Sequence, residues 1–150
     1  MQDIRQIIVP VDFHQHTDEL VEFAIGIANK MDAKLTFLHL VGEIGYHSEI
    51  RPESVKLIDE EFRSHAEKKM GELLEKNRGI CPGCTGMVVM GDAAEGVVNY
   101  AKDKNVDLII IGTHGTRGIK KILLGSVAER VLKSAHCPTL VFNPYKGERG

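Results

Sequence analysis

Ile109-Ile110-Ile111-Gly112-Thr113-His114-Gly115-Thr116-Arg117-Gly118 is the most informative stretch of this 150-residue chain. An apolar run ends in a glycine, a glycine-rich loop follows, and the pair Gly125-Ser126 then opens an amphipathic segment. Glycines let backbone N–H groups approach a ligand closely, and the N-terminus of a helix favours an anion. The pattern therefore predicts a buried strand, a phosphate-binding loop and a helix. It is neither a Walker A loop, which needs Gly-Lys-Ser/Thr, nor a GxGxxG loop.

Apolar runs and helical apolar repeats alternate along the whole chain. Short β-branched runs predict strands at residues 4–11, 33–41, 87–90, 106–111 and 137–142, with helices between them. Strict alternation indicates a mainly parallel sheet with helices on both faces and right-handed crossovers. We therefore expect an α/β, doubly wound, Rossmann-like three-layer sandwich whose five strands have the order 3-2-1-4-5.

Polar residues mark the expected helix starts. Thr17 is expected to cap the first helix, and Asp92, with Glu95, the third. Ser126, with Glu129, is expected to cap the last helix in the same way. The second helix is predicted at residues 53–77, with one apolar stripe formed by Val55, Ile58, Phe62, Ala66, Met70, Leu73 and Leu74.

Two features of the sequence converge on one place in this fold. Asp12 directly follows the first strand, and Gly112 ends the fourth. In a doubly wound sheet a ligand lies beyond the carboxyl ends of the strands where the strand order reverses, here between strands one and four. For Asp12 we favour a ligand role, toward ribose hydroxyls or a bound cation, over a role as a turn residue only. His39, on the second strand, is expected to be a satisfied core residue.

Composition limits the classes of function. The net charge of −2 provides no basic surface for nucleic acid. No apolar run approaches the ~20 residues that span a bilayer, so no membrane association is expected. The first residues lack the pattern of a signal peptide, and three cysteines do not suggest a secreted disulfide framework. We expect a single domain over residues 1–150, ordered from about residue 3 to about residue 144, in the cytoplasm.

The motif Cys81-Pro82-Gly83-Cys84 admits several interpretations. A thioredoxin-like CxxC opens a helix, whereas this one precedes a predicted strand. A zinc site takes about four ligands, and the chain has no second CxxC. We therefore favour neither a redox nor a metal role, and an occasional disulfide or cysteines shared across a dimer stay open.

Four motifs together resemble the nucleotide-binding subfamily of the universal stress protein family. They are Ile8-Val9-Pro10-Val11-Asp12, His39-Leu40-Val41, Gly91-Asp92-Ala93-Ala94-Glu95 and, most specifically, Gly112-x2-Gly115-x9-Gly125-Ser126. The resemblance implies a flavodoxin-type fold, an adenine nucleotide (ATP, or ADP or AMP) between strands one and four, and a homodimer joined through the last strand. It implies that the adenosine end meets Pro10, Val11, Asp12 and Val41. It implies that the phosphates meet Gly112, His114, Gly115, Gly125, Ser126 and Val127.

The chain departs from the family pattern after the first strand. His14 stands where the family usually has Ser, and Thr17 replaces a second common Ser. An imidazole is larger than a hydroxyl and can carry charge, so the side-chain contacts that the resemblance implies near the phosphates stay open at His14.

These features predict a regulatory ATP-binding module of stress response rather than an enzyme. Mg²⁺ is expected with the phosphates because of their charge. Relatives of this architecture that adenylate substrates carry Ser-Gly-Gly-x-Asp-Ser after strand one, where this chain has Asp12-Phe13-His14-Gln15-His16-Thr17. Slow ATP hydrolysis, or self-phosphorylation on Ser126 or a nearby hydroxyl, is one alternative. A partner-binding domain that uses no nucleotide is another, and the intact glycines argue against it.

Overall fold

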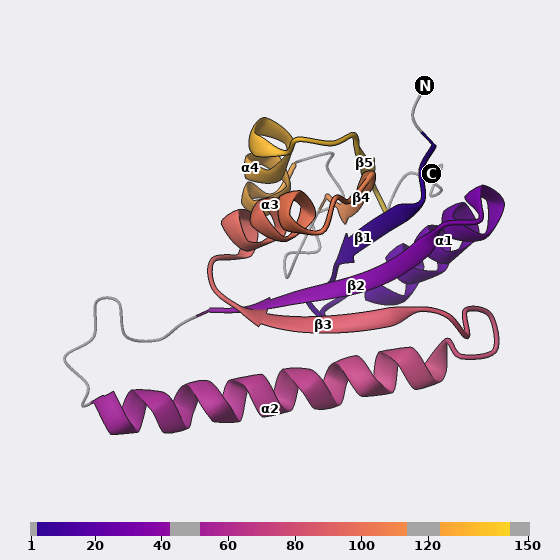
Figure 1. Ribbon diagram of the computed structural model, residues 1–150. Coiled ribbons are helices and arrows are strands. Elements are labelled where there is room, and N and C mark those ends of the chain that lie inside the picture. The colour runs from indigo at the N-terminus through magenta and orange to yellow at the C-terminus, as the bar shows by residue number, and fades with distance from the viewer. Residues whose placement is uncertain (1–2, 43–51, 114–123, 145–150) are drawn as a thin grey trace, which may run out of the picture.

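The computed structural model describes residues 3–42, 52–113 and 124–144 (Figure 1). These residues form five strands and four helices in strict alternation. The strands are β1 (Gln6–Pro10), β2 (Lys34–Val41), β3 (Thr85–Met90), β4 (Leu108–Gly112) and β5 (Thr139–Phe142). The helices are α1 (Thr17–Met31), α2 (Pro52–Lys76), α3 (Ala93–Asp103) and α4 (Ser126–Ser134).

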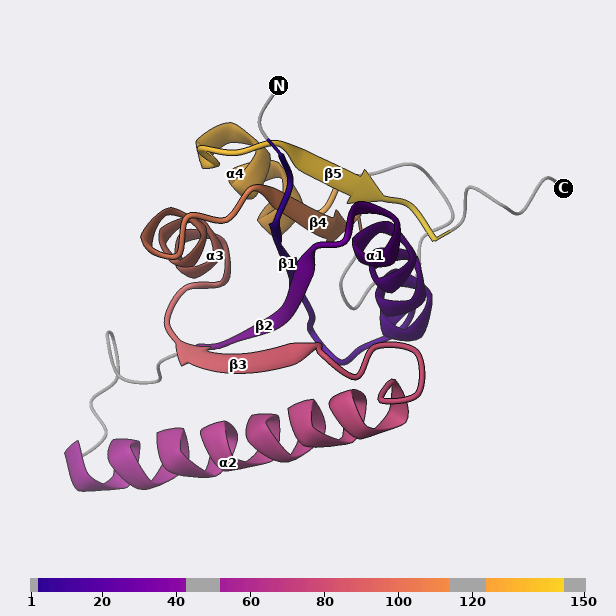
Figure 2. The same cartoon turned by 45° about the vertical axis from the view of Figure 1, so that its right-hand side comes forward.

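The sheet has the predicted topology. Its strand order is β3-β2-β1-β4-β5, and every pair of neighbouring strands is parallel. β1 lies in the centre, between β2 and β4 (Figure 2). Asp107 ties β1 to the segment before β4, because its Oδ2 accepts 2.9 Å hydrogen bonds from the N–H groups of Arg5 and Gln6. The carboxyl ends of β1 and β4 therefore lie side by side, as the predicted crevice requires.

β3 begins two residues earlier than the sequence suggested, at Thr85 rather than Met87. Thr85 pairs in register with Thr36 of β2, and their hydroxyl oxygens lie 2.8 Å apart. This hydrogen bond extends the pairing beyond the apolar residues that made the strand recognisable.

Each face of the sheet carries its own apolar core. α1 and α2 cover one face, and α3 and α4 cover the other, which gives the expected three layers (Figure 2). The first core contains Val9, Ala24, Phe37 and Met70 among its buried residues. The second core contains Ile8, Leu38, Val97 and Val131. Alternate residues of β1 and β2 thus point to opposite faces, as expected of strands buried on both sides.

α2 is longer than the part of the sheet that it covers. Its C-terminal half buries Ala66, Met70 and Leu73, whereas its N-terminal end reaches past the end of β3 (Figures 1 and 2). Phe62 is 49% exposed and Leu57 is 63% exposed. The prediction that Phe62 belongs to the buried part of the stripe is wrong, because its side chain is largely exposed. Within the described parts of the chain, no helix is both long and apolar enough to cross a membrane.

One of the three predicted helix caps is confirmed. Asp92 precedes α3, and its Oδ2 accepts a 2.9 Å hydrogen bond from the backbone N–H of Glu95. Thr17 is instead the first residue of α1, and its hydroxyl donates to the carbonyl oxygen of His14, 2.7 Å away. Ser126 is likewise the first residue of α4, and the cap position is a glycine that makes no side-chain bond. The caps predicted at Thr17 and Ser126 are therefore wrong by one position.

Candidate nucleotide site

A cavity of about 750 Å³ opens beyond the carboxyl ends of β1 and β4. Its volume lies within the range of about 300–1,000 Å³ typical of small-molecule sites. The wall comes from the β1–α1 turn, the end of β2, and the first turns of α3 and α4. Among the residues predicted from sequence, Pro10, Val11, Asp12, Gly112, Gly125, Ser126 and Val127 line it. The structure therefore brings two distant motifs to one crevice.

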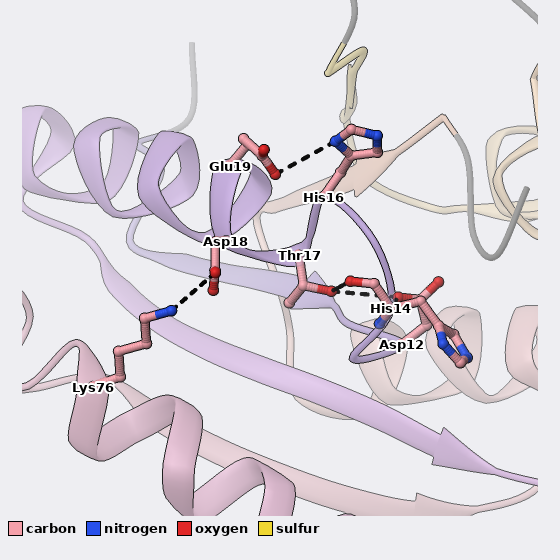
Figure 3. Close-up of polar contacts among 7 residues, drawn as sticks. All are labelled: Asp12, His14, His16, Thr17, Asp18, Glu19 and Lys76. Atoms are coloured by element: carbon pink, nitrogen blue, oxygen red, sulfur yellow. Dashed lines mark hydrogen bonds and ion pairs between the residues drawn. The ribbon is translucent and has the colours of Figure 1, made fainter. Parts of the chain in front are cut away.

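Asp12 organises the turn between β1 and α1 (Figure 3). Its Oδ1 accepts a 2.9 Å hydrogen bond from the backbone N–H of His14. The same oxygen lies 3.5 Å from the hydroxyl of Thr17. Oδ2 has no hydrogen-bond partner in the described ranges, so one carboxylate oxygen at the cavity wall is available to a ligand. Asp12 thus acts as a turn residue and keeps an oxygen for binding.

The β1–α1 turn holds two residues in a backbone conformation that ordinarily favours glycine. Phe13 has φ 62° and His16 has φ 69°. For residues with a side chain this left-handed region costs about 1–2 kcal/mol each. Such strain persists only where the surroundings enforce it, and it concentrates at functional sites. Because residues 12–17 contain no glycine, nothing in the sequence announced this conformation.

His39 links β2 to the end of β1. Its Nδ1–H donates to the carbonyl oxygen of Val11 over 2.6 Å, and its ring centroid lies 4.6 Å from that of Phe13. His39 is satisfied, as expected, but it also lines the cavity, which the sequence did not reveal. The N–H of Val11 donates to Leu38 over 2.9 Å. Both backbone groups of Val11 are therefore already bonded within the protein.

Val41, predicted at the adenosine end, occupies a different place from its neighbours on β2. Leu38, His39 and Leu40 line the cavity, whereas Val41 is not among the lining residues that the structure describes. Its side chain is buried, and its carbonyl oxygen accepts a 2.8 Å hydrogen bond from Gly91. Val41 thus anchors the β3–α3 connection.

Gly125 joins the N-terminus of α4 to the end of β4. Its N–H donates to the carbonyl oxygen of Thr113 over 2.6 Å. A Cβ at this position would lie 2.8 Å from the same oxygen, so the close approach itself requires glycine. The first N–H groups of a helix have no partner within the helix. At α4 they belong to residues such as Ser126 and Val127, which line the cavity, and they offer donors to an anion.

An ion pair clamps α3 to α4 behind the cavity. Arg130 donates through both terminal nitrogens to Asp92, at 2.9 and 3.3 Å. The N–H of Glu95, and then the guanidinium of Arg130, lower the pKa of Asp92 below its ordinary value. The two helices contribute Val97 and Ala128 to the apolar part of the wall. The acidic Glu129, near the start of α4, is paired with Lys133 at 3.1 Å, which offsets its repulsion of an anion.

Part of the predicted phosphate site lies outside the described residues. His114 and Gly115 fall there, and so do the basic residues Arg117, Lys120 and Lys121 of the same stretch of sequence. Conversely, the cavity is also lined by residues that were not predicted as ligand contacts, among them His16, Ala93, Val97 and Phe142. The apolar ones carry the same helical or strand spacing as core residues, so no signal distinguished them. His16 contacts Glu19 at 3.6 Å and is partly covered (Figure 3).

No group of three or more His, Cys, Asp or Glu side chains is arranged to hold a metal ion within the described ranges. Asp12 contributes a single carboxylate to the cavity. A hard cation here would therefore take most of its ligands from a bound molecule and from water, as Mg²⁺ commonly does with phosphates.

The fold and the crevice define a doubly wound α/β protein with a cavity at its topological switch point. The sequence model of the universal stress protein family matches residues 3–143. A universal stress protein of Methanocaldococcus jannaschii is 34% identical, over 96% of this chain and 85% of its own length. The chain belongs to the universal stress protein family.

Solved structures agree on the fold. The universal stress protein UspA of Lactobacillus plantarum superposes with a TM-score of 0.82 at 24% identity, covering 95% of this chain and 99% of its own. A universal stress protein family protein of Arabidopsis thaliana, solved with AMP bound, gives a TM-score of 0.63 at 20% identity. That match covers 97% of this chain and 95% of the plant protein.

Proposed function

We propose that this protein is a regulatory module that binds ATP, or ADP or AMP, in the cavity beyond β1 and β4. One observation carries the proposal: residues chosen from separate sequence motifs line a single cavity of ligand size. The Arabidopsis relative, which shares the fold, was solved with AMP bound. A regulatory role fits a protein whose nucleotide occupancy alters the surface around the crevice.

The proposed phosphate end lies at α4. Gly125 allows the helix start to approach Thr113, and the N–H groups of the first turn point out of the helix toward its N-terminal side. Gly112 ends β4 beside them. His114 and Gly115 would complete this end from the following loop. Backbone donors of this kind hold phosphates without a side-chain nucleophile.

The proposed adenosine end lies toward β2 and α3. Leu38, Leu40 and Val97 supply an apolar wall on which a purine ring can stack. In the proposed complex, Oδ2 of Asp12 would accept a hydrogen bond from a ribose hydroxyl or would bind a cation. Because the backbone of Val11 is already bonded, its share of the contact comes from its side chain.

Mg²⁺ would enter with the phosphates. Asp12 offers the hard carboxylate oxygen that this ion prefers, and the phosphate oxygens would supply further ligands. The ion would neutralise phosphate charge at the cavity mouth. At this end of the cavity, Asp12 would be the ligand of the ion, and the first residues of α4 would donate N–H groups to the phosphates.

We further propose a homodimer joined through β5. β5 is an edge of the sheet, and its residues are half-buried in the monomer. The carbonyl oxygen of Pro138 accepts a hydrogen bond from Ile109 of β4, and that of Phe142 accepts one from Thr113, which directly follows β4. By strand alternation, the backbone groups of Thr139 and Val141 face away from the sheet, where a second β5 can pair with them.

The decisive experiment identifies the nucleotide carried by the protein. Protein purified without added ligand is denatured, and the released small molecules are identified by chromatography and mass spectrometry. Isothermal titration with ATP, ADP and AMP, with and without Mg²⁺, then gives the affinities. We expect an adenine nucleotide in the extract and micromolar binding, on the order of −8 kcal/mol. An empty extract together with no heat from any of the three nucleotides would refute the proposal and favour the nucleotide-independent alternative.

The same protein tests for chemistry. Incubation with γ-labelled ATP measures both phosphate release and label on the protein. If wild-type protein releases phosphate or becomes labelled, and Ser126→Ala does neither, the slow enzyme is favoured over the binding module.

A further inference from the structure

Cys81 and Cys84 lie at the other end of the sheet from the nucleotide cavity, in the connection between α2 and β3 (Figures 1 and 2). They form a disulfide, with Cα atoms 5.4 Å apart. We propose that this pair is a reversible dithiol–disulfide site, which exchanges with the thiols and disulfides of a small molecule or a partner protein. The site is separate from the proposed nucleotide site, and neither proposal depends on the other.

The backbone holds the two cysteines together without help from the sulfur–sulfur bond. The N–H of Cys84 donates to the carbonyl oxygen of Cys81 over 3.2 Å, which closes a four-residue turn. Pro82 and Gly83 occupy the central positions, where proline presets φ and glycine adapts to the turn. A further 2.8 Å bond runs from the N–H of Cys81 to Asn77. None of these bonds involves sulfur, so reduction leaves the two thiols adjacent and ready to close again.

The turn is accessible from solvent. Pro82 and Gly83 are exposed, whereas Cys81 and Cys84 are half-buried against the core that α1 and α2 cover. An incoming thiol can therefore reach the sulfurs from the outer side of the turn while the core stays closed. A permanently enclosed structural disulfide would lack this approach.

The electrostatic setting favours the disulfide over the dithiol. In a helix-opening CxxC the helix N-terminus lowers the pKa of the first thiol and so stabilises the reduced form. Cys81 instead follows the carboxyl end of α2, whose partial charge is negative. The nearby Arg78 is engaged with Glu75 at 3.4 Å. We therefore expect the pair to be more reducing than a helix-opening CxxC, and to be reduced more readily by a dithiol than by glutathione.

The chemistry balances without any further reagent. The thiolate of one cysteine attacks a disulfide R–S–S–R, which gives a mixed disulfide and releases one R–S⁻. The thiolate of the other cysteine then attacks the protein-side sulfur, closes the Cys81–Cys84 bond and releases the second R–S⁻. The protein loses two electrons and two protons, and R–S–S–R becomes two R–SH. A dithiol reverses the same steps.

Cys137 provides an internal reference. It is free and packs against the core under α3 and α4, on the opposite face of the sheet from the pair. Only one intramolecular pairing is therefore available to the chain. Burial and the charge of Asp107 raise the pKa of the Cys137 thiol, which slows its reaction.

The test equilibrates the full chain, without denaturant, in dithiothreitol buffers and separately in glutathione buffers of graded redox ratio. Samples are quenched with acid, alkylated in denaturant and weighed by intact mass spectrometry. We expect wild type to carry one alkylated cysteine when the pair is oxidised and three when it is reduced. Cys137→Ser should carry none and two, respectively. The double variant Cys81→Ser, Cys137→Ser should retain one glutathione adduct on Cys84. In the protein with both cysteines of the pair, the second thiol displaces glutathione from this adduct and forms the disulfide.

Two further arms identify the exchange partner. One supplies glutathione, and the other a thioredoxin-type dithiol protein with its reductase; faster reduction in the second arm indicates a protein partner. The proposal is overturned if both thiols stay reduced in oxidised glutathione with no adduct on Cys81→Ser. It is equally overturned if the pair stays oxidised in every reductant until the protein is unfolded. Nucleotide affinity, measured on both forms, should be unchanged, which separates this result from the test of the nucleotide site.

Discussion

The backbone N–H of Gly125 lies 2.6 Å from the carbonyl oxygen of Thr113, so the start of α4 is fastened to the end of β4. The glycine has φ −63°, an angle open to any residue. Glycine is required because a Cβ at this position would lie only 2.8 Å from the carbonyl oxygen of Thr113. One contact therefore sets the position of the N–H groups that the proposed phosphates would meet.

Gly125→Ala should weaken nucleotide binding at least tenfold, because α4 must move away from β4 to admit the methyl group. The same clash should lower the free energy of unfolding by about 1–3 kcal/mol. Titration calorimetry and urea denaturation measure the two effects. Gly71→Ala is the matched control, since no atom lies within 4 Å of its added Cβ. That change should leave affinity intact and raise helix stability by up to about 1 kcal/mol.

Asp12→Asn separates the two roles of Asp12. The amide oxygen can still accept from the N–H of His14, so the turn is retained while the charge is lost. We expect nucleotide affinity in Mg²⁺ to fall about tenfold, or about 1.4 kcal/mol, with little change in melting temperature. Asp18→Asn serves as control, because it removes an exposed carboxylate paired with Lys76 on the outside of α1 (Figure 3). Equal affinities for Asp12→Asn and wild type would leave Asp12 as a turn residue only.

The Asp92–Arg130 pair should make stability depend on acid pH. The pKa of Asp92 is lowered in the folded protein, so the unfolded chain binds its proton first as pH falls below the ordinary value of 3.8. The stabilisation is present in full above that value and is lost as pH falls through the folded pKa.

Asp92→Ala should cost about 1 kcal/mol at neutral pH through loss of the cap, and progressively less in acid. Asp92→Asn keeps a good capping group and should cost less than alanine. Urea denaturation of each variant at neutral and acid pH measures these differences. A gap between wild type and Asp92→Ala that does not narrow in acid would contradict the assignment.

Val141→Pro should prevent dimer formation through β5. The N–H of Val141 faces away from β4 by alternation with Phe142, so proline removes a donor that only a second strand would use. Sedimentation equilibrium should show a dimer for wild type and a monomer for the variant. Circular dichroism confirms that the variant is folded. A wild-type protein that remains monomeric at high concentration would contradict the proposed interface.

Much of the fold could be predicted because strand and helix signals alternate without interruption. β4 is a run of buried isoleucines ending in glycine, and its place beside β1 follows from the order of elements. The errors arose where a residue's partner lies far away in sequence. Phe62 fits a helical stripe, yet its side chain stays largely exposed. Likewise, the cap of α4 was predicted at Ser126 but is Gly125. The reason is the close contact of Gly125 with the carbonyl oxygen of Thr113, which directly follows β4.

The candidate site was predictable where its residues are glycines or lie at the ends of strands. Asp12 and Gly112 were placed in one crevice by topology alone. The left-handed conformation of Phe13 and His16 was not foreseeable, because it is uncommon for any residue with a side chain. Nor was the bond from His39 to Val11, which depends on the register between β1 and β2.

The central position of β1 has a consequence for synthesis of the chain. β1 is made first, yet one of its two neighbours, β4, follows about a hundred residues later, as the 102-residue separation of Arg5 and Asp107 illustrates. While the ribosome completes the chain, β1 can pair with β2 but exposes its other backbone edge. An unpaired apolar edge on a nascent chain invites aggregation, and long-range parallel pairing is slow. We therefore expect that edge of β1 to stay without its partner strand until β4 has been synthesised.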